Sequence, residues 1–136
     1  MKLLTIHFLQ IAGLATLGIL FLQSGLDKVT DFKGNKAWLD GHFANSIFKN
    51  LVRPLLITIT IFEVIAGLAS AIGAVAFIIP STYAYGVQFG VYGCIFSLVS
   101  LICLFLGQRV AKDYAGAGGL VPYMLLAGLT MYVIIL

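Results

Sequence analysis

Four long apolar runs, separated by short polar connections, constrain this chain more than any other feature of its sequence. The first run, at about residues 3–28, opens with an almost uninterrupted apolar stretch. A helix of about 20 apolar residues spans a hydrocarbon core of ~30 Å. Three further runs, at about residues 54–79, 83–106 and 120–136, have the length to do the same. We therefore predict four membrane-crossing helices within a single domain, 1–136.

Composition supports an integral membrane protein. Hydrophobic residues make up 61% of the 136 residues and charged residues only 10%, which is far from the balance of a soluble domain. The net charge of +3 does not indicate nucleic-acid binding, because the basic residues lie beside the apolar runs and form no extended stripe. Short connections make neighbouring helices antiparallel. The expected fold is all-α, an integral membrane four-helix bundle.

The polar connection between the first two runs has a helical pattern of its own. Apolar residues recur at every fourth position: Leu39, Phe43, Ile47 and Leu51. This spacing predicts an amphipathic segment that lies in the headgroup region, a depth that also suits Trp38. In the alternative interpretation the segment folds back as a lid over the bundle, with Trp38 or His42 touching a ligand.

The basic residues are distributed unevenly between the two sides. Seven of the eight fall on the first and third connections or at their borders: Lys28, Lys33, Lys36, Lys49, Arg53, Arg109 and Lys112. Only Lys2 lies on the other side. The positive-inside rule then places the charged connections in the cytoplasm and both termini outside.

Glu63 is the one charged residue inside the second run. It lies nine residues past Pro54, which at ~1.5 Å per residue places it near the middle of the membrane. A carboxylate there costs about 2.5–3.5 kcal/mol on insertion scales and needs a partner or a proton. Small and hydroxylated residues share its helix face, so Glu63 should point into the protein. It either holds helices together or handles a proton or a ligand.

Two other helix faces are expected to face the interior. On the first helix a helical projection groups His7, Gln10, Leu14, Gly18, Phe21, Gly25 and Lys28. On the third helix it aligns Gly86, Gly90, Gly93, Ser97 and Ser100. Such a seam of small residues allows another helix to approach closely. The seam serves either a contact within the bundle or a dimer.

The charged ends of the helices should meet at one mouth. The first run ends at Ser24 and Gly25, followed by Asp27 and Lys28. The third connection adds Gln108, Arg109 and Asp113, with Arg109 and Asp113 spaced to pair along one helical turn, and a flexible stretch, 115–119, follows. Glu63 would lie beneath this mouth. The arrangement would suit an anionic or quinone-like head group or the passage of protons, or it would only lock the helices together.

The sequence contains no intrinsic electron carrier. Cys94 and Cys103 lie nine residues apart on one helix, on roughly opposite faces, so they cannot form a disulfide. There is no Cys-x-x-Cys pair, no histidine spacing for heme or a metal, and no nucleotide-binding loop. We expect no metal site and no intrinsic cofactor, although a quinone or a lipid can still bind.

Three short motifs resemble the DoxX family. They are Phe-Leu-Gln-Ser-Gly-Leu-Asp-Lys at the end of the first helix (21–28), Phe-Glu-Val-Ile-Ala-Gly in the second (62–67), and Gly-Gln-Arg-Val-Ala-Lys-Asp-Tyr-Ala-Gly-Ala before the last (107–117). The resemblance spans essentially the whole chain. It implies a four-helix protein of the bacterial inner membrane, associated in some members with a thiosulfate:quinone oxidoreductase. The family pattern marks Ser24, Gly25, Lys28, Glu63, Gln108, Arg109 and Asp113.

The leading functional hypothesis is a non-catalytic accessory subunit of a redox-linked membrane complex. Lys28 and Arg109 would supply positive charge to a quinone or lipid head group, Glu63 and Asp113 the compensating acids, and Gln108 a neutral hydrogen bond. Expected partners are membrane lipids and either a membrane protein or further copies of this chain, with no nucleic acid. The alternatives are a catalytic quinone-linked oxidoreductase subunit and a small proton or solute transporter.

Overall fold

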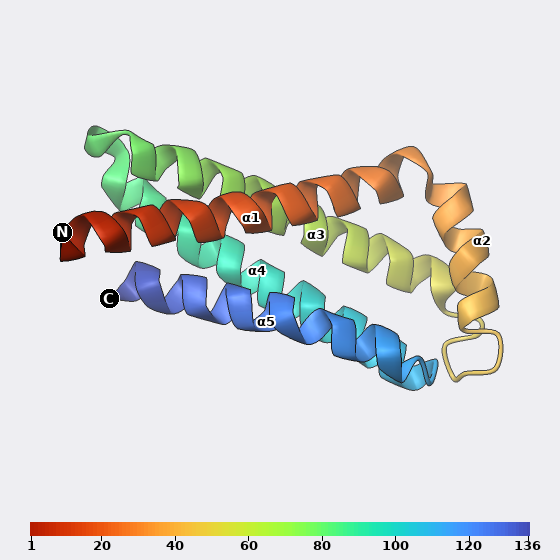
Figure 1. Cartoon of the computed structure of the whole chain (residues 1–136). Coiled ribbons are helices and arrows are strands. Elements are labelled where there is room, and N and C mark those ends of the chain that lie inside the picture. Colours follow the sequence, from red (N-terminus) through yellow and green to blue (C-terminus); the bar gives the residue numbers. More distant parts are fainter.

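The computed structural model describes residues 1–136 and is all-helical. Its elements are α1 (Lys2–Thr30), α2 (Phe32–His42), α3 (Val52–Ile78), the short 3-10 helix η1 (Pro80–Thr82), α4 (Tyr83–Val110) and α5 (Tyr114–Ile135). Four helical segments are long and apolar enough to cross a membrane: α1, α3, α4 together with η1, and α5. Both termini lie at one end of the molecule, and α2 lies across the other end (Figure 1).

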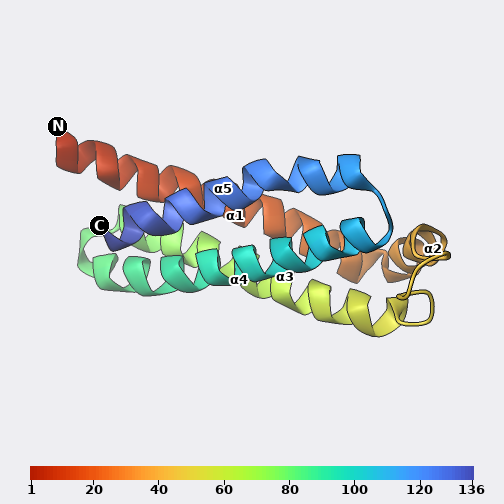
Figure 2. The ribbon, with the colours of Figure 1, turned by 90° about the horizontal axis from the view of Figure 1, so that it is seen from below.

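The four long helices pack side by side in antiparallel order. α3 lies between α1 and α4, α5 packs on α4, and α3 and α5 lie diagonally opposite each other. α1 meets α5 in the half that holds the termini, where Gly13 packs against Thr130. Toward the α2 end, the two helices diverge (Figures 1 and 2).

The glycine seam of α4 is an internal contact. A Cβ atom at Gly93 would clash with the Ser70 hydroxyl oxygen, and one at Gly73 would lie 2.8 Å from the Gly90 backbone nitrogen. These positions therefore let the backbones of α3 and α4 come together. Of the two uses left open by the sequence, the structure shows the contact within the chain.

The expected inward faces are largely confirmed. On α1, most of the grouped positions are buried, including Gln10, Gly18 and Gly25. The aligned glycines and serines of α4 are all buried. The α3 face that carries Glu63 is buried as well.

The expected amphipathic segment is only half helical. α2 ends at His42, and residues 43–51 form turns. Ser46 explains part of this, because its hydroxyl donates to the Phe43 carbonyl (2.9 Å) and accepts from the Phe48 N–H (3.2 Å); such local bonds compete with a helix. The prediction that the helix continues beyond Phe43 is therefore wrong. The headgroup location of the segment stays a prediction.

The last helix begins earlier than the sequence suggests. Asp113 accepts a hydrogen bond from the Gly116 N–H (2.9 Å) and so caps α5 at its start. The stretch at 115–119, expected to be flexible, is helical. Lys112 takes a left-handed conformation with φ 61°, which allows the chain to reverse within three residues between α4 and α5.

Candidate ligand-binding site

Glu63 lies at the centre of a buried ion-pair cluster. Its side chain is 1% exposed, and one carboxylate oxygen lies 2.9 Å from the Lys28 ammonium nitrogen. The Ser24 hydroxyl donates to the carboxylate, with both oxygens at 3.1 Å. The same hydroxyl accepts a hydrogen bond of 2.8 Å from Lys28. The acid therefore points into the protein, as the sequence predicts, and Lys28 is its counter-ion.

Local sequence explains how these three side chains meet. Ser24 and Lys28 are four residues apart, one turn of α1, and so lie on the same helix face. Gly25 lies between them and packs on α3: a Cβ atom there would lie 2.8 Å from a Val64 methyl carbon. This close approach allows the short Ser24 side chain to reach Glu63.

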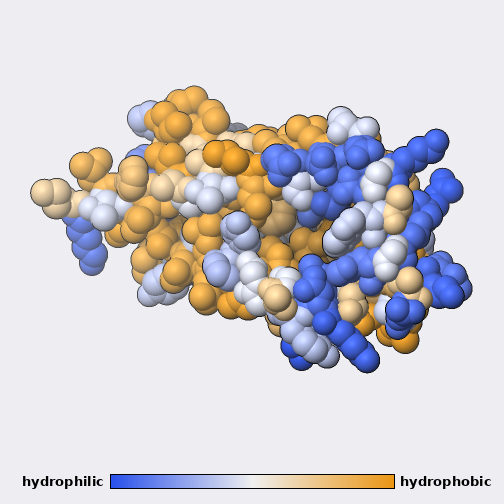
Figure 3. All heavy atoms as spheres, turned by 45° about the vertical axis from the view of Figure 1, so that its right-hand side comes forward, coloured by the Kyte–Doolittle hydropathy of each residue, from blue (hydrophilic) through white to orange (hydrophobic).

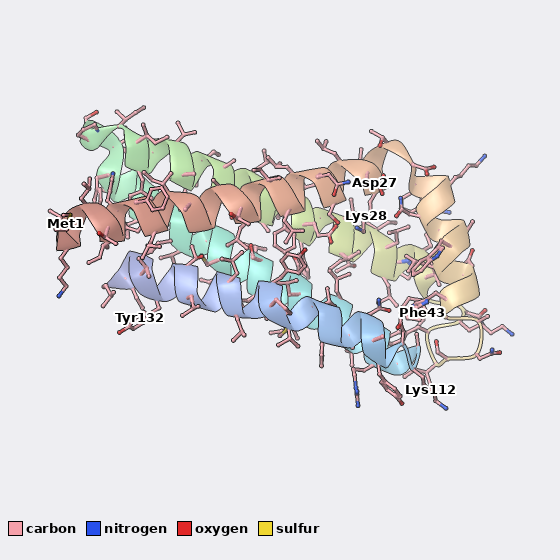
Figure 4. The ribbon with its side chains drawn as sticks, in the orientation of Figure 1. Met1, Asp27, Lys28, Phe43, Lys112 and Tyr132 are labelled. Carbon is pink, nitrogen blue, oxygen red and sulfur yellow. The ribbon has the colours of Figure 1, made fainter.

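The cluster lies beside a cavity of about 330 Å³. This volume is at the small end of the range for ligand pockets. Its 17 lining residues come from all five α-helices and the 43–51 turns, and twelve of them are hydrophobic. Lys28, Asn35, His42 and Gln108 supply polar groups. The Lys28 side chain is 15% exposed and projects from α1 in Figure 4.

α2 covers this cavity with few contacts of its own. None of its residues is buried. The His42 ring bonds to the Gln108 side-chain oxygen of α4 at 2.6 Å, and Trp38 stacks on His42 with ring centroids 4.5 Å apart. Both Trp38 and His42 line the cavity, while Trp38 is also 62% exposed. Their positions therefore fit a cover over the cavity and an interfacial anchor equally.

The remaining residues of the expected mouth lie elsewhere. Asp27 is exposed and accepts a hydrogen bond from Asn35 (3.2 Å). Arg109 is exposed and lies over the Tyr114 ring at 4.4 Å. No ion pair joins Arg109 to Asp113, because α4 ends at Val110 and Asp113 caps α5. The mouth of mixed charge is therefore smaller than expected, with Lys28 as its one cation.

Sequence reasoning missed several residues of the cavity wall. Asn35 has no motif around it. Phe43, which is 8% exposed, was part of the interfacial pattern and instead packs inward. Leu120 lines the cavity from α5, at the start of the last apolar run. Only the tertiary arrangement brings these residues together.

The metal-ligating and thiol side chains are dispersed in this structure. No group of three or more His, Cys, Asp or Glu side chains lies close enough to hold a metal ion. Cys94 and Cys103 are both free; Cys94 is buried and Cys103 is exposed on the cavity wall. The predicted absence of a disulfide between them is confirmed.

The terminal end has a different polar group. Gln10, 2% exposed, donates to the Val133 carbonyl (3.3 Å) and the Tyr83 hydroxyl (3.4 Å). Gln10 therefore links α1 to α4 and α5 by hydrogen bonds between helices. His7 stacks on Tyr83 with centroids 5.9 Å apart, and both rings line an open cleft at this end.

Comparisons with protein families, with curated proteins and with solved structures find no match to this chain.

Proposed function

We propose that this protein is a four-pass protein of the bacterial inner membrane. The apolar helices support the four crossings. Hydrophilic residues gather around the α2 end, and the rest of the visible surface is mainly hydrophobic (Figure 3). The positive-inside rule favours a cytoplasmic location for the α2 end and an outside location for both termini. The assignment to a bacterial inner membrane rests on the resemblance to the DoxX family.

Within the membrane, we propose a non-catalytic binding role at the cavity. The ligand is an amphipathic molecule, a quinone or a lipid, whose head group enters beside Lys28 and whose chain runs along the apolar wall. One observation carries this proposal: an apolar cavity of about 330 Å³ that has a half-buried ammonium group on its wall. Ligand pockets typically combine such an apolar lining with a few placed polar groups.

The architecture also favours an accessory subunit over an independent enzyme. At the cavity, Lys28 is held by Glu63 and Ser24, and His42 by Gln108, and none of these groups is a redox centre. Large apolar side chains remain exposed along α5, including Leu125 and Leu129, where lipids or another membrane subunit can pack. The DoxX resemblance supports a redox-linked complex as the partner.

A filled cavity tests the binding role. The double variant Ile59→Phe/Leu104→Phe enlarges two lining residues. The matched control Ile61→Phe/Ile102→Phe makes the same changes on the same two helices, at side chains that are 52% and 54% exposed. Each protein is purified from its native membrane in mild detergent, and bound small molecules and proteins are identified by mass spectrometry.

We expect a stoichiometric quinone or lipid with the wild type and the control, and its loss from the filled variant. A ligand that stays with the folded filled variant would contradict the cavity as its site. A stoichiometric protein partner would support the accessory role, while quinone reduction by the purified chain alone would contradict it.

A further inference from the structure

The ion-pair cluster has a consequence for the charge of the ligand. An ammonium group has three N–H donors. Two of the Lys28 contacts are short, to Glu63 at 2.9 Å and to the Ser24 hydroxyl at 2.8 Å. The third, to the Ser24 backbone carbonyl, is 3.4 Å long. The positive charge is therefore already neutralised, while one N–H makes only a weak bond that a ligand oxygen can replace.

No other charged residue offsets this balance. The titratable residues of the cavity wall are Lys28 of α1, His42 of α2 and Cys103 of α4. The wall residues of α3 and α5 are apolar. Glu63 of α3 lies behind Lys28 and is 1% exposed. Asp27 and Arg109 are exposed at the surface and make other contacts. Lys28 and Glu63 carry opposite charges, so the ion pair beside the cavity has no net charge.

We infer that Glu63 makes this cavity selective for uncharged amphiphiles that carry a carbonyl or hydroxyl oxygen. This inference rests on the proposed binding function. An anionic head group would compete with Glu63 for the same cation and leave one negative charge without a partner in an apolar site, which is strongly unfavourable. An uncharged oxygen needs only the weakly used N–H of Lys28 and the amide of Gln108. Quinones and diacylglycerols share this chemistry, whereas anionic phospholipids do not.

The fluorescence of Trp38 can report binding in the cavity, because Trp38 is the only tryptophan in the chain and lines the cavity. The full-length protein in neutral detergent micelles is titrated with three probes, and Trp38 fluorescence is recorded. Dioleoylglycerol and dioleoylphosphatidate have the same chains and differ by a phosphate, and a short-chain ubiquinone is the second uncharged probe. The filled variant Ile59→Phe/Leu104→Phe is the control: any change of its Trp38 fluorescence comes from binding outside the cavity.

For the wild type, we expect at least one uncharged probe to bind at least tenfold more tightly than dioleoylphosphatidate. Glu63→Gln keeps the size of the side chain and removes its charge, so it leaves Lys28 unneutralised. The affinity for dioleoylphosphatidate should then rise at least tenfold. Lys28→Met/Glu63→Gln removes both charges and should restore the wild-type preference. The matched control Asp40→Asn breaks the exposed Lys36–Asp40 pair and should leave the preference unchanged.

The outcomes separate this inference from the proposed function. Wild-type protein that binds dioleoylphosphatidate as tightly as the uncharged probes would overturn the inference and leave the binding role intact. An equal shift in Glu63→Gln and Asp40→Asn would also overturn it, because general surface charge would then explain the selectivity. If Glu63→Gln does not fold, the inference is tested by the preference of the wild type for an uncharged probe over dioleoylphosphatidate. If no probe gives a response above that of the filled variant, the proposed binding function itself fails.

Discussion

The two halves of the helix assembly are built differently. In the half that holds the termini, glycines bring helices into contact: Gly73 meets Gly90 across α3 and α4, and Gly13 meets Thr130 across α1 and α5. In the half near α2, α1 stays on α3 through Gly25 and Val64, but it diverges from α5 (Figure 1). The cavity lies in this second half. Contacts at small residues bring the helices together in the half that holds the termini, which we call the closed half. The divergence of α1 from α5 leaves space in the half near α2, which we call the open half.

The polar groups differ in the same way. The closed half contains Gln10, whose hydrogen bonds go to neutral partners on α4 and α5. The open half contains the Lys28–Glu63 pair, which is buried and bridged by Ser24. Breaking a buried ion pair usually costs more than losing a neutral hydrogen bond. The open half should therefore respond most strongly to single polar substitutions.

Lys28→Met should have the largest effect on stability. It removes the counter-ion of a carboxylate that is 1% exposed, and an unpaired buried charge typically costs about 3–5 kcal/mol. The double variant Lys28→Met/Glu63→Leu replaces the whole pair with apolar side chains and should recover most of the loss. The free energy of unfolding in mixed micelles, measured by titration with a denaturing detergent, checks both expectations.

Lys36→Met is the matched control for that variant. It breaks the pair with Asp40, whose side chains are 38% and 46% exposed, and it should cost about 0–1 kcal/mol because water and salt screen the charges. Equal losses in Lys28→Met and Lys36→Met would show that burial does not distinguish the two pairs. A double variant that is no more stable than Lys28→Met would show that Lys28 and Glu63 do not depend on each other.

Gly93→Ala should have the next largest effect, and it tests the closed half. The new methyl group would clash with the Ser70 hydroxyl oxygen and would lie 2.8 Å from the Ser70 backbone nitrogen. Because the backbone of α3 cannot move without disturbing its other contacts, overpacking should cost about 1–3 kcal/mol. The same unfolding titration measures the loss.

Gly128→Ala on α5 is the control, since a Cβ atom there has no neighbour within 4 Å. Alanine should stabilise that helix by up to about 1 kcal/mol, in line with its higher helix propensity. If the two alanine variants behaved alike, close helix contact would not explain the closed half.

The sequence predicts one kind of feature well, because hydropathy and helical periodicity are local. The apolar runs became α1, α3, α4 and α5, and the inward direction of Glu63 followed from the small residues on its face. The expected start of the last helix failed because Asp113 supplies a cap that extends α5 backward. Periodicity alone did not reveal that the hydroxyl of Ser46 would support turns after α2.

The cavity was harder to predict, because it depends on where helices separate. Lys28 and Glu63 are 35 positions apart, and they could be paired only by assuming a compact bundle. Arg109 was assigned to the same mouth because it lies near the end of the third run. The structure instead places its guanidinium over Tyr114. The direction of a side chain at a helix end depends on the next turn of the chain, which apolar patterning does not specify.

His42→Ala should have a smaller, local effect in the open half. It removes the 2.6 Å bond to Gln108 and the ring on which Trp38 stacks. We expect a loss of about 1 kcal/mol, concentrated in α2 because that helix has no buried residue of its own. Hydrogen exchange, read by mass spectrometry, should show faster exchange in residues 32–42 and little change in α3. Faster exchange throughout the chain would contradict a local role for this contact.

Arg109→Gln should have the smallest effect, and it sharpens the boundary of the open half. Arg109 is exposed, does not line the cavity, and interacts with the Tyr114 ring. A cation–π contact at such a site is worth about 0.5–1 kcal/mol, so stability should fall by no more than that. The probe affinities read from Trp38 fluorescence should match those of the wild type. A tenfold change in them would show that Arg109 acts on the ligand after all, since neutral glutamine removes the charge from this position while keeping a polar side chain.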